Sequence, residues 1–268
     1  MNWKYEEAKP KGILSELIEC YWWEDFSNKN PGRIQHVVPD NSIELIFIRS
    51  PFYRSSPAFE KQWQVQSHLS GLKTKNQYCI LEESPLISIR FKPKGFYLFS
   101  KIAPKSTIDN CLSIDSCFGK NILALENQLF QAENPEQRIE ILNDYFTQLF
   151  LINEMRRDTL FESIAQEIED CMGMTSIDQL SEKFDVSTKT IQRRFLLHLG
   201  ITPKKYCRLI RVVHCLKQST HYQQLTQLAY ESDYYDQSHF VRDIKSVITC
   251  TPSHFSRSDK GIQSPYFS

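Results

Sequence analysis

The sequence is poor in glycine, with eight in 268 residues, and none of them lies in a phosphate-binding loop motif. It also lacks G-x-S-x-G, and it has no paired-carboxylate or Cys-His motif with a recognisable spacing. Nucleotide-binding folds depend on glycine-rich turns, so these absences count against a nucleotide-dependent enzyme. We therefore predict no catalytic residues and no cofactor.

Long apolar runs are also missing. No stretch approaches the roughly 20 residues that a membrane-spanning helix needs. The first residues, MNWKYEEAKPKG, lack the apolar region of a signal peptide. The expectation is a cytoplasmic protein that makes no membrane contact.

Paired cysteine motifs are absent as well. The eight cysteines are scattered, with no C-x-x-C and no zinc-ligand spacing. Because no zinc-ligand spacing is present, we predict no metal site. In a reducing compartment the cysteines are expected to be free thiols. An alkylation- or redox-sensing protein that uses an N-terminal cysteine stays open as an alternative, because four of them lie in the first half: Cys20, Cys79, Cys111 and Cys117.

The chain has no overall excess of charge, with 32 basic and 32 acidic residues, but the two signs are unevenly distributed. Residues 171–260 contain 13 Lys/Arg and 8 Asp/Glu, a net charge of +5. Residues 1–170 carry a net charge of −5. A mildly basic C-terminal region suits contact with phosphates, although this excess is also within the range of an ordinary surface.

The last third of the chain contains one pattern twice. The first copy runs from Leu180 through LSEKFDV, IQRRF and LGITPKKY, and the second runs from Leu228 through LAYESDY, FVRDI and ITCTPSHF. The copies align first at an offset of 48 residues and then at 49, which places one extra residue in the second turn. A duplicated helix-turn-helix is the simplest object that fits, and a protein that reads double-stranded DNA is the leading hypothesis.

Each copy has the features of two short helices joined by a turn. Ile177, Leu180 and Phe184 recur at helical spacing and give the first helix one apolar face. Asp185, and Asp233 in the second copy, stand where the chain leaves the helix, so a left-handed backbone conformation is expected there.

The second helix of each copy is expected to carry the DNA contacts. Ser187 and Asp236 can cap it as side-chain acceptors, while Ile191 and Phe195 lie at i and i+4 and face inward. The side chains between them face outward and can bond to base edges or phosphates. The candidate DNA-binding residues are Ser187, Thr188, Lys189, Gln192 and Arg193 in the first copy and Gln237, Ser238, His239 and Arg242 in the second.

A connecting helix is predicted between the copies. Residues 203–219 begin at Pro203 and carry an apolar stripe at helical spacing. Seventeen helical residues span about 25 Å. That length can hold two recognition helices in successive major grooves, about 34 Å apart.

These motifs together resemble the DNA-binding domain of the AraC/XylS transcription regulators. The resemblance covers residues 172–257 and rests on LSEKFDVSTKTIQRRF, LGITPKKYCRLIR, LAYESDYYDQSHFVRDIK and TPSHF. It implies base contacts by the outward residues of both second helices, favours activation of transcription, and makes RNA polymerase a candidate partner. Three positions depart from the family pattern, Asp233, Tyr234 and Thr249, and they predict a weaker contribution from the second motif.

The N-terminal half is expected to be strands first and helices after them. Alternating and β-rich segments predict strands at Ser42–Arg49, Gln64–Leu69, Tyr78–Leu81 and Leu86–Lys92. Apolar spacing of three and four predicts helices at Gly95–Lys101, Asn121–Gln131, Glu136–Leu151 and Thr159–Met172. This order suits a small β-barrel or jelly roll with a helical hairpin.

This half resembles an N-terminal domain found on a subset of AraC-type regulators. The resemblance covers about residues 8–115 and rests on VVPDNSIELIFI, HLSGLKTK and ISIRFKPKGFYLFSKIAP. It implies a truncated cupin-like sensor without naming its effector. The paired-histidine pattern of metal-binding cupins is absent, and His36 and His68 stand alone.

At three points in this half the sequence leaves more than one interpretation open. The Tyr21-Trp22-Trp23 cluster is favoured as a core anchor over a pocket lining. Glu44 is favoured as a solvent-facing strand residue over one that points inward to meet Arg90. The helices at 136–151 and 159–172 form a dimer contact, or they cover the barrel or pack against each other.

The resulting fold prediction is α+β, with a cupin-like N-terminal domain and an all-α C-terminal domain of two helix-turn-helix motifs. The predicted divisions are 1–118, a sensor domain; 119–171, a helical linker; 172–258, the double helix-turn-helix domain; and 259–268, a tail. The predicted function is sequence-specific regulation of transcription, modulated by a small-molecule effector or by homodimerisation. A module whose helix-turn-helix pair binds protein is a further alternative, but its outward polar side chains suit base edges better.

Overall fold

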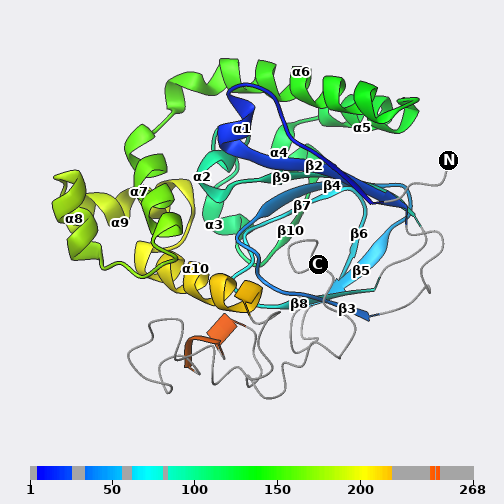
Figure 1. Ribbon diagram of the computed structural model, residues 1–268. Coiled ribbons are helices and arrows are strands. Elements are labelled where there is room, and N and C mark those ends of the chain that lie inside the picture. Colours follow the sequence, from blue (N-terminus) through cyan, green and yellow to red (C-terminus); the bar gives the residue numbers. More distant parts are fainter. Residues whose placement is uncertain are drawn as a thin grey trace.

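The computed structural model describes residues 5–25, 34–55, 62–80, 84–218, 242–244, 246 and 247 (Figure 1). Their N-terminal part is rich in strands and the rest is helical. We call residues 5–118 the sheet-rich domain. The strands are β1 (Glu6–Ala8), β2 (Ile18–Asp25), β3 (Ile34–Val37), β4 (Ile43–Ile48), β5 (Phe52–Ser55), β6 (Gln62–Val65), β7 (His68–Ser70), β8 (Gln77–Ile80), β9 (Pro85–Phe91) and β10 (Cys111–Ser113).

The helices of the sheet-rich domain are short, and longer ones follow. Those within it are α1 (Leu14–Leu17), α2 (Pro93–Phe96), α3 (Pro104–Thr107) and α4 (Ile114–Phe118). The later ones are α5 (Ile122–Gln131), α6 (Pro135–Asn153), the 3₁₀ turn η1 (Glu154–Arg156), α7 (Thr159–Asp170), α8 (Ile177–Phe184), α9 (Thr188–His198) and α10 (Pro203–Gln218).

The strands form two antiparallel sheets. One has the order β1-β2-β9-β4-β7-β10 and the other β3-β8-β5-β6. No strand of one sheet pairs with a strand of the other among the described residues, so the predicted closed cupin-like barrel is not confirmed. The broader expectation, a sheet-rich N-terminal domain followed by a helical region, is confirmed.

One predicted strand proves to be two. The segment predicted as Gln64–Leu69 bends at residues 66 and 67. Before the bend β6 pairs with β5, and after it β7 pairs with β4. The chain changes sheet at this bend, so the apolar pattern on its two sides belongs to different layers.

The central strands alternate their side chains between two apolar layers, as period-two geometry requires. On β4, Ile43, Leu45 and Phe47 join the main core, which continues under the helices. Ile46 and Ile48 point to the other face and join a smaller cluster with residues of the four-stranded sheet. The six-stranded sheet is therefore covered on both faces, which accounts for the burial of every β4 residue.

Helices cover one face of the six-stranded sheet. In Figure 1, α5 and α6 lie along the side of this sheet that is opposite the four-stranded sheet. Leu142, Phe146 and Phe150 of α6 are buried in the main core, and Phe146 packs against Phe91 of β9 at 5.4 Å between ring centroids. This arrangement supports the covering role for α6, and the dimer contact stays a prediction.

Two expectations about buried side chains have clear outcomes. Tyr21, Trp22 and Trp23 are buried, as the core-anchor interpretation predicted. The favoured solvent-facing position of Glu44 is wrong. Its carboxylate is buried and lies 2.9 Å from Nη2 of Arg90, across the β4–β9 pairing. Both side chains point between the two sheets because they share the face of Ile46.

Candidate nucleic-acid interface

Helix α8 begins with a reciprocal cap. Ser176 accepts a hydrogen bond from the backbone N–H of Gln179, and the Gln179 side chain accepts from the Ser176 N–H. This capping box satisfies two of the otherwise unpaired N–H groups at the helix start. Leu180 is buried on the inner face, with Ile177 and Phe184 packed beside the core, as predicted from their spacing.

The turn after α8 has the predicted left-handed residue. Asp185 has φ 51° and ψ 47°, and its N–H bonds back to the carbonyls of the last turn. The Ser181 hydroxyl donates to the carbonyl of Val186 at 2.6 Å and closes the turn from inside. The sequence pattern therefore identified both the position and the conformation of this turn.

Asp185→Gly is expected to stabilise the protein by about 0.5–1 kcal/mol, because glycine adopts a left-handed conformation without the cost that a Cβ imposes. Urea unfolding of the full chain would measure the change. Glu182→Gly, on the exposed face of α8, is the matched control and should destabilise by about 1 kcal/mol. A loss of stability in both variants would show that Asp185 contributes more than its backbone conformation.

Helix α9 presents the first group of candidate residues. Ser187 caps it by accepting from the N–H of Thr190 at 3.1 Å. Ile191 and Phe195 are fully buried on its inner face. The predicted outward side chains are exposed: Ser187, Thr188, Lys189, Gln192 and Arg193. Their orientation is as predicted, and their role in binding DNA stays a prediction.

The second group lies mostly outside the described residues. Gln237, Ser238 and His239 fall there, as do the departures at 233, 234 and 249. Arg242 is described and exposed, within a helical stretch at 242–244.

Helix α10, the predicted connecting helix, contacts the stretch at 242–244 through ion pairs. Asp243 is buried and accepts ion pairs from Arg208 and Arg211 of α10 at 3.1 and 3.3 Å. Helix α10 begins at Pro203, and its predicted stripe is buried: Tyr206, Leu209, Ile210, Val213 and Leu216. The described part of the second motif is therefore anchored on this helix.

Sequence reasoning missed the contacts that the C-terminal end of α9 makes with other parts of the chain. Arg194 forms an ion pair with Asp158, the residue before α7, and His198 Nε2 lies 2.9 Å from the same carboxylate oxygen. The His198 ring also packs on Tyr97 of the sheet-rich domain, at 4.3 Å between centroids. An Asp before TLFE is a recognisable helix cap, but nothing in the sequence pattern indicated its partners.

The four cysteines of the first half do not have the character of reactive thiols. Burial raises the pKa of Cys20 and of Cys117 to about 12 and that of Cys79 to about 11, and it also raises the pKa of Cys111. A reactive cysteine needs a lowered pKa and access to solvent. Nothing here supports the alkylation- or redox-sensing alternative.

Within the described part of the chain, no group of three or more His, Cys, Asp and Glu side chains is placed to hold a metal ion. Among the same residues, no helix combines the length and the apolar character that crossing a bilayer requires.

Comparison with known families matches both parts of the chain. Residues 180–258 match a helix-turn-helix domain family, and residues 6–113 match a domain family of unknown function, DUF6597. The HTH-type transcriptional activators RhaS of Salmonella arizonae and Salmonella paratyphi B are each 35% identical over 66 residues. That alignment covers 24% of this chain and 23% of each relative, so the chain spans about a quarter of the length of these relatives.

Solved structures show a distant likeness. ToxT from Vibrio cholerae has a TM-score of 0.48 at 12% identity, over 88% of this chain and 96% of that chain. The AraC-like transcriptional activator CuxR has a TM-score of 0.37 at 11% identity, over 80% and 87%. Because these TM-scores lie below 0.5, the similarity to transcription regulators rests on the helix-turn-helix match and on RhaS alone.

The helix-turn-helix match and the α8–turn–α9 geometry define this part of the chain as a helix-turn-helix domain. Over this region the chain is similar to transcription regulators of the AraC/XylS type, among them the RhaS activators.

Proposed function

We propose that the protein is a sequence-specific, double-stranded DNA-binding activator of transcription. The observation that carries this is the exposed face of α9. Lys189, Gln192 and Arg193 lie outward on a capped helix whose opposite face is fully buried. A helix whose inner face is buried, with hydrogen-bonding side chains on its outer face, fits the major groove.

The proposed interface uses two motifs. Arg193 and Gln192 read base edges in one groove, and Ser187, Thr188 and Lys189 contribute phosphate or base contacts near the start of α9. Gln237, Ser238, His239 and Arg242 do the same in the next groove. The 16 residues of α10 span about 24 Å and set the separation of the two motifs.

Activation is proposed because the similar RhaS proteins are named as activators. RNA polymerase is then a partner, and the sheet-rich domain, as a cupin-like sensor, modulates DNA binding through a small-molecule effector or through homodimerisation. Residues 1–118, 119–171, 172–258 and 259–268 are proposed as sensor, linker, DNA-binding domain and tail. A cytoplasmic location suits these roles.

The test of DNA binding is selection from a random double-stranded DNA library with the full chain, followed by titration of the enriched sequence over a range of salt concentrations. Two short boxes about one helical turn apart, with an affinity that falls as salt rises, are expected. Absence of any enriched sequence would contradict the proposed function.

Arg193→Ala is expected to weaken binding to that enriched sequence by about 1–3 kcal/mol and to relax the preference at one base pair. Competition binding with single-base variants of the operator would measure this. Lys120→Ala removes an exposed cation before α5 and serves as the control, with no expected change. A uniform loss across all sequences, with a smaller salt dependence, would instead assign Arg193 to a phosphate.

A further inference from the structure

The two ends of α9 face different surroundings. The first two turns carry the exposed residues on the proposed DNA side, whereas one side of the last turn is packed against the sheet-rich domain. His198 lies 4.3 Å from the Tyr97 ring and 4.9 Å from the Phe161 ring, measured between centroids. A Cβ on Gly200, just after α9, would lie 2.6 Å from the backbone nitrogen of Lys105 in α3. The rear of the recognition helix is therefore in direct contact with the sheet-rich domain.

Asp158 is the polar anchor of that rear end. One carboxylate oxygen accepts from the N–H of Phe161 at 3.1 Å and caps α7. The other accepts from Arg194 and lies 2.9 Å from His198 Nε2. Burial alone would raise the pKa of Asp158, but the hydrogen bonds from Phe161, His198 and Arg194 together lower it. The carboxylate is thus held in its charged form, in which these bonds are strong.

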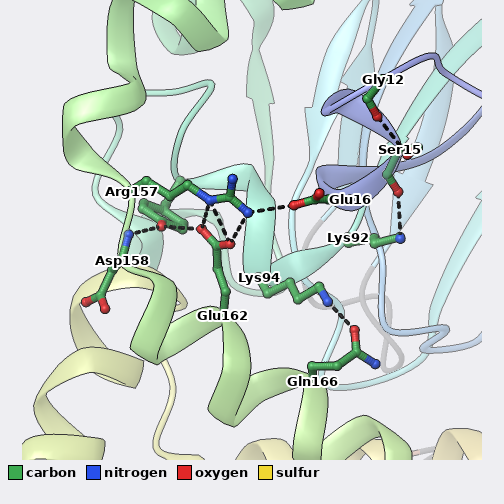
Figure 2. Close-up of polar contacts among 10 residues, drawn as sticks. Gly12, Ser15, Glu16, Lys92, Lys94, Arg157, Asp158, Glu162 and Gln166 are labelled. Carbon is green, nitrogen blue, oxygen red and sulfur yellow. Dashed lines mark hydrogen bonds and ion pairs between the residues drawn. The ribbon is translucent and has the colours of Figure 1, made fainter.

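The same residue is tied to the sheet-rich domain through its backbone. The Asp158 N–H donates to the Tyr97 hydroxyl at 2.7 Å, and that hydroxyl donates to Glu162 at 2.9 Å. Arg157 then joins Glu162, at 2.9 Å, to Glu16 of α1, at 2.7 Å. Figure 2 shows this series of polar contacts, from Glu16 of α1 through Arg157 and Glu162 to Asp158 at the start of α7. Polar contacts therefore continue from α1 of the sheet-rich domain to α9.

We infer that Asp158 is a positioning residue for DNA reading, which sets the orientation of α9 and transmits to it the position of Tyr97 in the sheet-rich domain. This inference rests on the proposed function, and it assigns the coupling between sensor and DNA-binding domain to one junction. Asp158 touches no DNA in this scheme, because its carboxylate is directed at the buried end of the helix.

The length of α9 makes its orientation sensitive to this anchor. Eleven helical residues span about 16 Å. A tilt of about 4° about the C-terminal end of α9 moves its N-terminal end by about 1 Å over that length. Hydrogen bonds to base edges weaken over a few tenths of an ångström, whereas contacts of a flexible lysine with phosphates tolerate such a shift. Loosening the anchor therefore removes specificity before it removes general affinity for DNA.

The test compares full-length variants on the enriched operator and on unrelated DNA. Asp158→Asn retains the helix cap, since asparagine also caps well, but it removes the charge that Arg194 and His198 contact. Its affinity for the operator is expected to fall about tenfold, the change that corresponds to about 1.4 kcal/mol, while affinity for unrelated DNA changes less than about twofold. Asn134→Ala is the matched control, because it removes the cap of α6 without touching α9.

Tyr97→Phe tests the link to the sheet-rich domain. It removes the hydroxyl that bonds Asp158 and Glu162 and keeps the ring against His198. Its operator affinity is expected to fall in the same direction, and its effect should not add to that of Asp158→Asn, because both changes break one connected chain. Additive effects in the double variant would overturn the transmission from Tyr97.

The outcomes separate the inference from the proposed function. If the wild-type chain enriches no operator, the proposed function itself fails. If it does and Asp158→Asn binds like wild type, the positioning role is wrong. An equal loss on operator and unrelated DNA, or a loss matched by Asn134→Ala at the same melting temperature, would reduce Asp158 to a stabilising residue and overturn the inference.

Discussion

Glu44→Ala is expected to destabilise the protein by about 3–5 kcal/mol, because it removes one partner of a buried ion pair. One oxygen of Glu44 accepts from Nε of Arg90 at 2.9 Å and from the Trp22 indole at 3.1 Å, and it also lies 2.9 Å from Nη2 of Arg90. Arg90 is only 2% exposed, so water cannot replace the lost carboxylate. The midpoint and slope of urea unfolding would measure the loss.

The matched control is the double variant Glu44→Leu/Arg90→Met. It replaces both charges by apolar groups of similar length, and such replacements are often neutral or stabilising. A double variant as unstable as Glu44→Ala would show that packing around these side chains, and not the isolated charge, dominates. Glu44→Ala close to wild type would contradict the buried position of the pair.

Phe195→Ala is expected to destabilise by about 3–5 kcal/mol, the usual result of truncating a buried phenylalanine. The ring is fully buried, 5.1 Å from Phe161 of α7 and 5.6 Å from Tyr206 of α10 between centroids. The cavity would lie beneath α9, the helix proposed to read DNA, so operator binding should also be lost. Thermal unfolding and operator titration of the same sample would measure both effects.

Leu196→Ala is the control for this prediction. Leu196 is the next residue on α9 and is 46% exposed, so its truncation should change stability by less than about 0.5 kcal/mol. Equal melting temperatures for the two variants would contradict the assigned inner face of α9.

Much of the helix-turn-helix region was predictable because its signals are local. The cap at Ser187, the left-handed Asp185 and the inward pair Ile191 and Phe195 depend on neighbours within a few residues, and all are as predicted. The start of α10 at Pro203 follows the same logic.

The sheet-rich domain was less predictable. The strands β4 and β9 were found from their apolar alternation, but the bend that divides β6 from β7 was missed because both halves continue one β-rich pattern. The barrel expectation followed from the order of strands and helices and from a resemblance, and pairing between sheets depends on edges that a pattern does not describe. Glu44 illustrates the same limit, since alternation gives its face of the strand but not what covers that face.

The sequence by itself determined the repeat, the cap at Ser187 and the outward residues of α9, because these arise from contacts between residues a few positions apart. Only the tertiary structure decided that Glu44 meets Arg90, 46 positions away, and that Asp158 meets Arg194 and His198, 36 and 40 positions away. Such pairs form when packing brings distant segments together. Burying these charged groups costs free energy, and the charge-assisted hydrogen bonds to their distant partners offset that cost. No local pattern records those partners.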